Sequence, residues 1–339
     1  FEDNTVVHYA YQNATGSQEV HVTLTPVSDT RIKKIVCAPL CAIPVIFVPG
    51  VMGSNLKLKD NPNGETVWHA PNSKVGALPL LFEFFFKTPK ERQERFNPVN
   101  AEVDWNGPID AGPVRLNEPE GTLATLRKRG WGSVHADAYH GLLQQLHLQL
   151  NDMQLPRALV KDEALPPFWA QLTQPPKDWG STSTAQALSP QQLRQLCRYR
   201  FDVWACGYNW LQSNLTSGED LHAYIQKVLQ IYKDSGCVLD SDPPMKVIVV
   251  THSMGGLVLR GLLQIPGAAD HILGVVHGVQ PATGAPAVYK RMRAGFEGVE
   301  QVVLGRDAAE AVPVLANAPA LLEMLPFANY NWGQPWLKA

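Results

Sequence analysis

The sequence has no long hydrophobic run and no excess of charge of either sign. Its two most apolar stretches, residues 43–52 and 77–86, are interrupted by Pro44, Pro49 and Glu83. Both are too short to cross a bilayer, which takes about 20 apolar residues. The 29 Lys+Arg and 31 Asp+Glu residues leave a net charge of −2, so no broad basic face is available for a nucleic acid. We therefore expect neither an integral membrane protein nor a partner of nucleic acids.

Cysteine is scarce, and the five cysteines are an odd number, which argues against a framework of disulfides. Cys37 and Cys41 are close enough in sequence to share a metal ion, but no second pair with such a spacing accompanies them. A chain of this length buries about 75% of its unfolded surface and needs no metal to fold. We therefore expect no metal at these cysteines.

The N-terminus lacks the features of a signal peptide. Phe1 to Asn4 carry acidic rather than basic side chains, and no apolar segment follows them. Export by a route without a visible signal, earlier removal of the signal and a cytosolic location all fit these residues.

Short apolar runs alternate along the chain with segments of helical periodicity. The runs are typical of strands buried on both faces of a sheet, and they lie at residues 44–48, 201–206, 246–250 and 272–276. Segments with apolar residues along one helix face lie at 139–150, 220–233 and 257–264. Strands that alternate with helices predict an α/β fold with a mostly parallel sheet.

The remaining segments divide the chain into parts. Residues 1–42 form an N-terminal extension, in which alternation over 19–25 predicts a half-buried strand. Residues 43–339 hold the α/β core. Large insertions, rich in Pro and Trp and with little periodicity, interrupt this core at about 57–130 and 151–198.

A strand-to-helix junction carries the most specific chemical signal. The run before Thr251 is β-branched, a helical segment follows Gly256, and Ser253 lies in the short turn between them. This is the context that a nucleophile elbow requires, although Thr251 stands where the pattern usually has glycine. The start of the helix directs backbone N–H groups at the serine, which favours an anionic intermediate. We predict that Ser253 is a catalytic nucleophile.

An oxyanion hole needs a second N–H donor. Gly50 and Gly53 flank Val51 directly after the first core strand, so the backbone there is free to turn an N–H toward the substrate. We predict that the amides of Val51 and Met254 form the oxyanion hole.

These residues belong to a series of blocks that runs through most of the chain, from 43 to 336. The first blocks are residues 43–56, Trp131–Val134, Tyr208–Trp210 and Thr251–Gly256. In this order they resemble successive segments of the lecithin:cholesterol acyltransferase-like lipases. Residues 276–286 and 318–332 resemble two later segments of that family. The series is specific, whereas each block alone is not.

The resemblance implies an α/β-hydrolase fold that cleaves acyl esters, often of phospholipids, without a metal or organic cofactor. The group includes bacterial lipase effectors delivered by type VI secretion, which suits the missing signal peptide. It implies a lipid or phospholipid substrate and peripheral contact with a membrane. An inhibitory immunity protein or a component of the secretion machinery is the implied protein partner, and the site of action is a periplasm or a membrane surface.

Three functions remain open from the residues. The first is a serine-dependent lipase or phospholipase that forms an acyl-enzyme on Ser253. The second is an acyltransferase, in which an alcohol replaces water in the second step. The third is a catalytically silent protein with this fold that binds a lipid or a partner.

The most hydrophobic part of the insertions is Leu78–Phe86. It is either the core of its insertion or a lid that faces lipid, since an enzyme that acts on aggregated lipid must present apolar surface.

The other two members of a catalytic triad are not evident. In α/β hydrolases an acid and then a histidine follow the serine, but only His271 and His277 occur after Ser253. His271 is expected at the opposite end of the sheet. His277 comes one strand after the serine, which is too early for the base, and is expected to line the pocket. We therefore expect the catalytic Asp and His, and the strands that carry them, to lie beyond Ala339.

Overall fold

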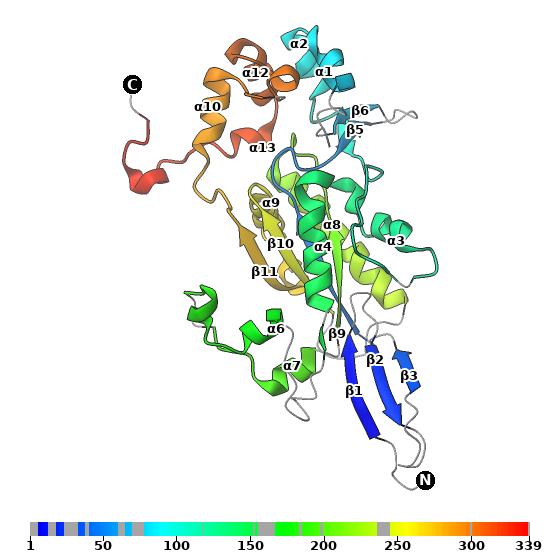
Figure 1. Ribbon diagram of the computed structural model, residues 1–339. Helices are drawn as coiled ribbons and strands as arrows, with labels where there is room; N and C mark the ends of the chain where they lie inside the picture. Colours follow the sequence, from blue (N-terminus) through cyan, green and yellow to red (C-terminus); the bar gives the residue numbers. More distant parts are fainter. Residues whose placement is uncertain are drawn as a thin grey trace.

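The computed structural model describes most of the chain in a three-layer α/β arrangement (Figure 1). The described residues are 6–12, 18–23, 33–37, 41–59, 65–69, 78–116, 118–151, 153–154, 167–182, 185–196, 199–235, 245–298 and 300–337.

Four strands form the central sheet in the order β11-β10-β4-β9, and all of their pairings are parallel. They are β4 (Cys41–Val48), β9 (Tyr199–Ala205), β10 (Val247–His252) and β11 (Ile272–Gly278). All four predicted core strands are thus confirmed, with small differences at their ends. Because the strands are parallel, the loops that follow them gather at one edge of the sheet, where the site lies.

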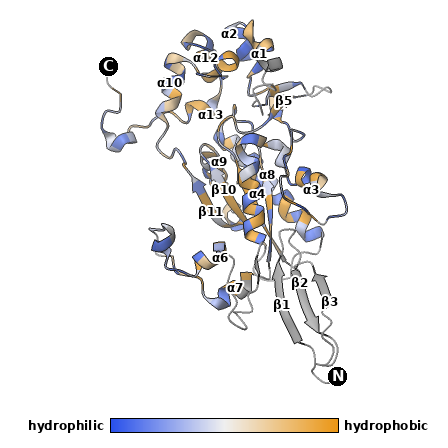
Figure 2. Cartoon of the chain, in the orientation of Figure 1, coloured by the Kyte–Doolittle hydropathy of each residue, from blue (hydrophilic) through white to orange (hydrophobic). Residues whose placement is uncertain are grey.

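Alternate residues of β4 show why the sheet is covered on both faces. Ile46 and Val48 belong to a core cluster that includes α8 (Asn214–Asp234) and α9 (Gly255–Leu262). Val45 and Phe47 belong to a second cluster, formed with α4 (Ala136–Asn151). Side chains of a strand point to opposite faces in turn, so this unbroken apolar run serves two helix layers. Figure 2 shows apolar residues concentrated at the central strands.

The three predicted core helices are also confirmed. Helix α8 begins at Asn214, six residues before the predicted start at 220. The side chain of Ser213 accepts a hydrogen bond from the N–H of Leu215 at 3.1 Å and so caps the helix. Periodicity of apolar residues did not reveal this first turn. No helix among the described residues is long and apolar enough to cross a membrane.

The N-terminal part forms an antiparallel sheet of its own, in the order β3-β2-β1-β8. Its strands are β1 (Val6–Gln12), β2 (Gln18–Thr23), β3 (Lys33–Cys37) and β8 (Met153–Gln154). The strand predicted over 19–25 corresponds to β2.

Both predicted insertions contain regular structure that the sequence pattern did not reveal. The first holds the small sheet of β5 (Leu56–Leu58), β6 (Thr66–Trp68) and β7 (Ala101–Val103), with α1 (Leu78–Phe85), α2 (Pro89–Arg95) and α3 (Thr122–Lys128). The described part of the second holds α6 (Pro167–Leu172) and α7 (Pro190–Leu196). Short elements of this kind depend on tertiary contacts for their stability.

Helices from two distant parts of the sequence form a cap at the end of the molecule toward which β10 and β11 point (Figure 1). In this cap, α12 packs against α2 and α1 packs against α11. The C-terminal helices are α10 (Pro286–Ala294), α11 (Glu300–Leu304), α12 (Ala308–Leu315) and α13 (Pro319–Leu322).

A buried arginine joins the two halves of this cap. The Arg92 guanidinium donates to the carbonyl oxygens of Val303 at 2.7 Å and Phe84 at 2.8 Å. It also donates to the carbonyl of Val302. A single side chain therefore satisfies backbone groups of α1 and α11, which are more than 200 residues apart.

The outer strand β11 leaves one edge of the sheet open among the described residues, since β10 is its single strand partner there. Leu273 and Val276 are each 57% exposed. An apolar edge of this kind is a template for a further strand. The expectation of additional strands remains a prediction.

Candidate active site

Ser253 lies on the tight turn between β10 and α9, with the backbone geometry of a nucleophile elbow. Its φ is +50°, a left-handed conformation that is uncommon for a residue with a side chain. The N–H of Ser253 donates to the carbonyl of Gly278 at 2.8 Å, which ties the turn to the end of β11. Strained backbone of this kind is frequent at catalytic residues.

Local contacts explain why residue 255 is glycine and why residue 251 is threonine instead of the usual glycine. A side chain at Gly255 would come within 2.7 Å of the carbonyl oxygens of Val48 and Pro49, so the start of α9 approaches β4 directly. Thr251 is buried, and its hydroxyl lies 2.7 Å from Nδ1 of His277. The usual glycine is therefore replaced by a threonine that binds the neighbouring strand.

His277 does not line the cavity next to Ser253, contrary to the sequence-based expectation. It is exposed on the outer strand β11 and contacts Thr251 instead. Its position at the end of a strand suggested the cavity, but the open edge of the sheet leaves its side chain in solvent.

The loop after β4 forms a turn that faces the elbow. The N–H of Gly53 donates to the carbonyl of Gly50 at 3.1 Å, and Met52 has a φ of +61°. A side chain at Gly50 would lie 3.1 Å from Cβ of Ser253, so the loop and the elbow are in direct contact. Glycine is required there.

The two predicted oxyanion donors are available. Neither the N–H of Val51 nor that of Met254 donates to another group within the described part of the chain. Val51 lines the same cavity as Ser253. Met254 directly follows the serine, with its side chain fully buried in the core. The role of these two amides as oxyanion donors remains a prediction.

Tyr139 of α4 links the loop to the elbow. The N–H of Gly50 donates to the Tyr139 hydroxyl at 3.1 Å, and this hydroxyl lies 3.0 Å from Nδ1 of His252. The Tyr139 oxygen therefore bridges the loop and the elbow, because it accepts from Gly50 and shares a hydrogen bond with His252. Burial raises the pKa of Tyr139 and lowers that of His252, so both groups stay neutral at pH 7.

We expect Tyr139→Phe to loosen this loop. The variant leaves the Gly50 N–H and the His252 nitrogen without their partner, which costs about 1–3 kcal/mol. Urea unfolding should show a loss of this size, and kcat for a soluble ester should fall while KM changes little. Tyr289→Phe, a partly exposed tyrosine on α10, is the control. Unchanged kcat in a destabilised Tyr139→Phe variant would limit the tyrosine to a structural role.

A cavity of about 380 Å³ opens at Ser253 and is mostly apolar. It is lined by Val51, Met52, Trp210, Ser253, Ala285, Ala287, Val288, Arg291, Phe296, Glu297, Glu300, Leu304, Val314, Leu315, Leu321 and Met324. These described lining residues include no histidine and no aspartate. The Ser253 hydroxyl makes no hydrogen bond to a described residue, and no histidine base for it is among the described residues around the cavity. No group of three or more metal-ligating side chains occurs in the described ranges.

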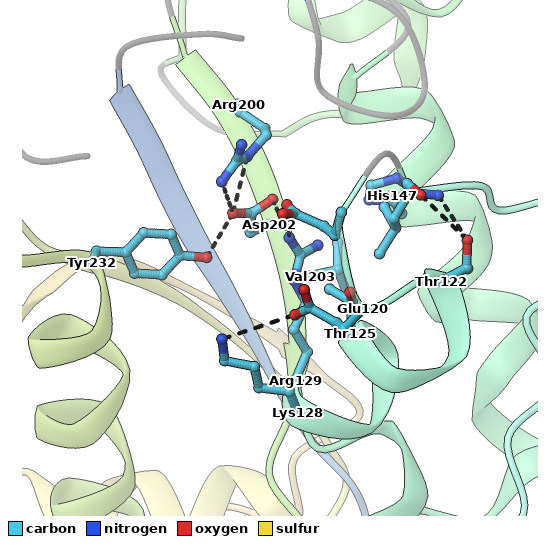
Figure 3. Close-up of polar contacts among 12 residues, drawn as sticks. Glu120, Thr122, Thr125, Lys128, Arg129, His147, Arg200, Asp202, Val203 and Tyr232 are labelled. Carbon is cyan, nitrogen blue, oxygen red and sulfur yellow. Dashed lines mark hydrogen bonds and ion pairs between the residues drawn. The ribbon is translucent and has the colours of Figure 1, made fainter. Parts of the chain in front are cut away.

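A second polar cluster surrounds Asp202 in β9 (Figure 3). Arg200 and the Tyr232 hydroxyl donate to one carboxylate oxygen at 2.9 and 2.6 Å, and Arg129 lies 3.0 Å from the other. Burial alone would raise the pKa of Asp202, but Arg129 and Arg200 hold it below its usual range. The charges compensate one another, so we assign this cluster to stability.

Sequence reasoning found the elbow and the loop but missed Tyr139, Arg291 and the role of His252. Tyr139 was recognised only as part of an apolar helix face, and the sequence analysis assigned no role to His252. Tyr139 and His252 contact each other although more than 100 residues separate them in the sequence. A local sequence pattern does not reveal such a contact.

The fold and the elbow together define an α/β-hydrolase-like domain with a parallel central sheet. The family model of the PGAP1-like alpha/beta domain matches residues 211–308, which include the elbow. A chain in the crystal structure of the Tle4–Tli4 complex is similar to this chain, with 40% sequence identity and a TM-score of 0.74. The match covers 87% of this chain but 56% of that chain, so this chain spans little more than half of its length.

A search of curated proteins gives no match. The two similarities bear out the resemblance to α/β-hydrolase lipases that the sequence blocks indicated.

Proposed function

We propose that this chain is the nucleophile-bearing part of a lipase or phospholipase. One observation carries the proposal: Ser253 has a left-handed backbone conformation on the turn between β10 and α9 and lines a mostly apolar cavity. The N–H groups of Val51 and Met254 lie in the two turns that form this site and donate to no described group. Similarity to the PGAP1-like domain and to the chain from the Tle4–Tli4 structure supports a hydrolase.

In the proposed reaction, Ser253 Oγ attacks the carbonyl carbon of an acyl ester. The N–H groups of Val51 and Met254 hold the negative oxygen that forms, and the N-terminus of α9 favours the same charge. The alcohol then leaves with a proton, and the acyl group remains on the serine. Water attacks this ester and releases the fatty acid.

Serine is a weak nucleophile at neutral pH and needs a general base. Because the described cavity residues include no histidine and no aspartate, we propose that the Asp and His of the triad lie beyond Ala339.

Labelling with a fluorophosphonate tests this function on the full chain, by which we mean the protein together with the proposed segment beyond Ala339 that brings the Asp and the His. A functional elbow forms a covalent adduct with Ser253, which peptide mass spectrometry locates. Absence of labelling in a folded protein would favour the catalytically silent alternative. Product analysis with an added alcohol separates hydrolysis from acyl transfer, because a transferase gives the new ester.

We also propose that α1 contacts the lipid surface. Phe82, Phe85 and Phe86 are 73%, 57% and 81% exposed, whereas Phe84 is fully buried and stacks on Phe96. The helix therefore serves both of the roles considered for Leu78–Phe86, since one side packs into the cap and the other presents apolar surface.

Replacing Phe82, Phe85 and Phe86 with serine should lower activity on phospholipid vesicles about tenfold or more. The change removes apolar area that enters the bilayer but leaves the core residue Phe84 in place. Activity on a soluble short-chain ester should be retained. Leu123→Ser, which removes an exposed apolar residue of α3, is the control. Equal losses on vesicles and soluble ester would contradict lipid contact.

The implied partner and location remain part of this proposal. The similar solved chain comes from a complex of Tle4 with Tli4, which supports the idea that an inhibitory immunity protein binds this chain. The proposed site of action is a periplasm or a membrane surface. Co-purification with the product of a neighbouring gene, together with inhibition of esterase activity, would test the partner.

A further inference from the structure

Among the residues that line the Ser253 cavity, a few carry polar groups that an apolar acyl chain does not satisfy. Trp210 is 1% exposed and lines the cavity, but its indole N–H has no hydrogen-bond partner among the described residues. A buried donor without an acceptor is costly. The lining of the cavity therefore includes a residue with an unsatisfied donor besides its apolar side chains.

Arg291 is the positively charged residue among the described residues that line the cavity. It lies on α10 one turn after Ala287 and Val288, which line the cavity with it. Its guanidinium stands over the ring of Phe296, 5.5 Å from the centroid. Nη1 is buried, and its distance of 3.5 Å to the Glu297 carboxylate gives an ion pair without a hydrogen bond.

The surrounding carboxylates leave Arg291 only partly neutralised. Glu297 is shared with Lys290, whose ammonium donates to it at 2.8 Å. Glu300, also at the cavity, makes no ion pair with a described residue. A positive and a negative group are thus both available to a ligand at the cavity wall.

We propose that Arg291 and Glu300 recognise the headgroup of a zwitterionic glycerophospholipid. Arg291 binds the phosphate, since a guanidinium presents N–H groups in the geometry that phosphate oxygens accept. Glu300 binds the ammonium group and disfavours a headgroup with further negative charge. The apolar lining takes an acyl chain, whose ester reaches Ser253. This inference rests on the proposed lipase function and makes its substrate specific.

The test compares phosphatidylethanolamine with diacylglycerol of the same acyl chains, both in mixed micelles with the full chain. Arg291→Gln should lower kcat/KM for the phospholipid by about 10- to 100-fold, the effect of losing a charge-assisted hydrogen bond. Activity on diacylglycerol should change less than about threefold. Arg293→Gln is the matched control, because Arg293 is exposed on the same helix and does not line the cavity.

Glu300→Gln tests the second contact. It should reduce the preference for phosphatidylethanolamine over phosphatidylglycerol and leave diacylglycerol hydrolysis unchanged. Equal losses on phospholipid and diacylglycerol in Arg291→Gln would overturn headgroup recognition while the lipase function stands. Failure of the unaltered protein to hydrolyse any of these lipids, or to react with a fluorophosphonate, would overturn the proposed function itself and the inference with it.

Discussion

Ser253→Ala is expected to lower kcat for ester hydrolysis by about 10⁶-fold, because loss of a nucleophile removes the covalent route altogether. The variant keeps the elbow, and the substitution removes only a hydroxyl that makes no hydrogen bond to a described residue. The melting temperature should therefore stay within a few degrees. Hydrolysis of a short-chain ester by the full chain, followed with purified variants, measures the effect.

Ser189→Ala provides the control for activity, since Ser189 is exposed and is not a cavity residue. Its hydroxyl accepts a hydrogen bond from the N–H of Gln192 at 3.3 Å and caps α7, so this variant controls activity and not stability. It should retain full activity. Turnover of Ser253→Ala within about tenfold of the unaltered protein would exclude the serine as nucleophile. Fluorophosphonate labelling should disappear in the same variant, which ties the kinetic loss to the hydroxyl.

Asp202→Asn is expected to cost about 3–5 kcal/mol of unfolding free energy at pH 7, because it leaves two arginines without their buried counter-charge. Asp202 is 1% exposed, and the side chains of Arg129 and Arg200 are 6% and 15% exposed. Little of these side chains is in contact with solvent, so water replaces the lost carboxylate only in part. Urea unfolding of the two proteins at neutral pH measures the difference.

The pH dependence supplies a second measurement. Since the pKa of Asp202 is lowered in the folded protein, its stabilisation is complete above the unfolded value of about 3.9. It is lost as pH falls through the lower folded value. The difference in unfolding free energy between Asp202→Asn and the unaltered protein should thus become smaller below about pH 4.

Glu120→Gln is the control for this cluster (Figure 3). Glu120 lies 4.0 Å from Lys128, and both side chains are substantially exposed. Pairs of this kind contribute about 0–1 kcal/mol, so the variant should unfold almost as the unaltered protein does. A similar small loss in Asp202→Asn would mean that the buried arginines find other partners.

The central elements were predictable because their signals are local. Apolar runs such as 246–250 mark strands buried on two faces, and the spacing in 139–150 marks one face of a helix. The turn at Ser253 is likewise encoded next to its own residues, through Gly255 and the strand before it. Gly50 and Gly53 likewise allowed the turn after β4 to be predicted from neighbouring residues.

The cap was much less predictable. Residues 78–86 were recognised as apolar, but their pattern did not say which phenylalanines are buried. That division depends on Phe96 and on Arg92, which holds the end of α1 against the carbonyl of Val303. The position of His277 was also not predictable from local sequence, because its side chain is exposed only as a result of the open edge of β11.

The sequence by itself determined the α/β class, the core strands and helices, and the positions of Ser253, Val51 and Met254, because each depends on backbone preferences within a few residues. Only the tertiary structure placed Tyr139 between Gly50 and His252, and Arg291 on the wall of the Ser253 cavity. Contacts between residues far apart in the chain depend on how the layers pack, and packing is a property of the whole fold rather than of any segment.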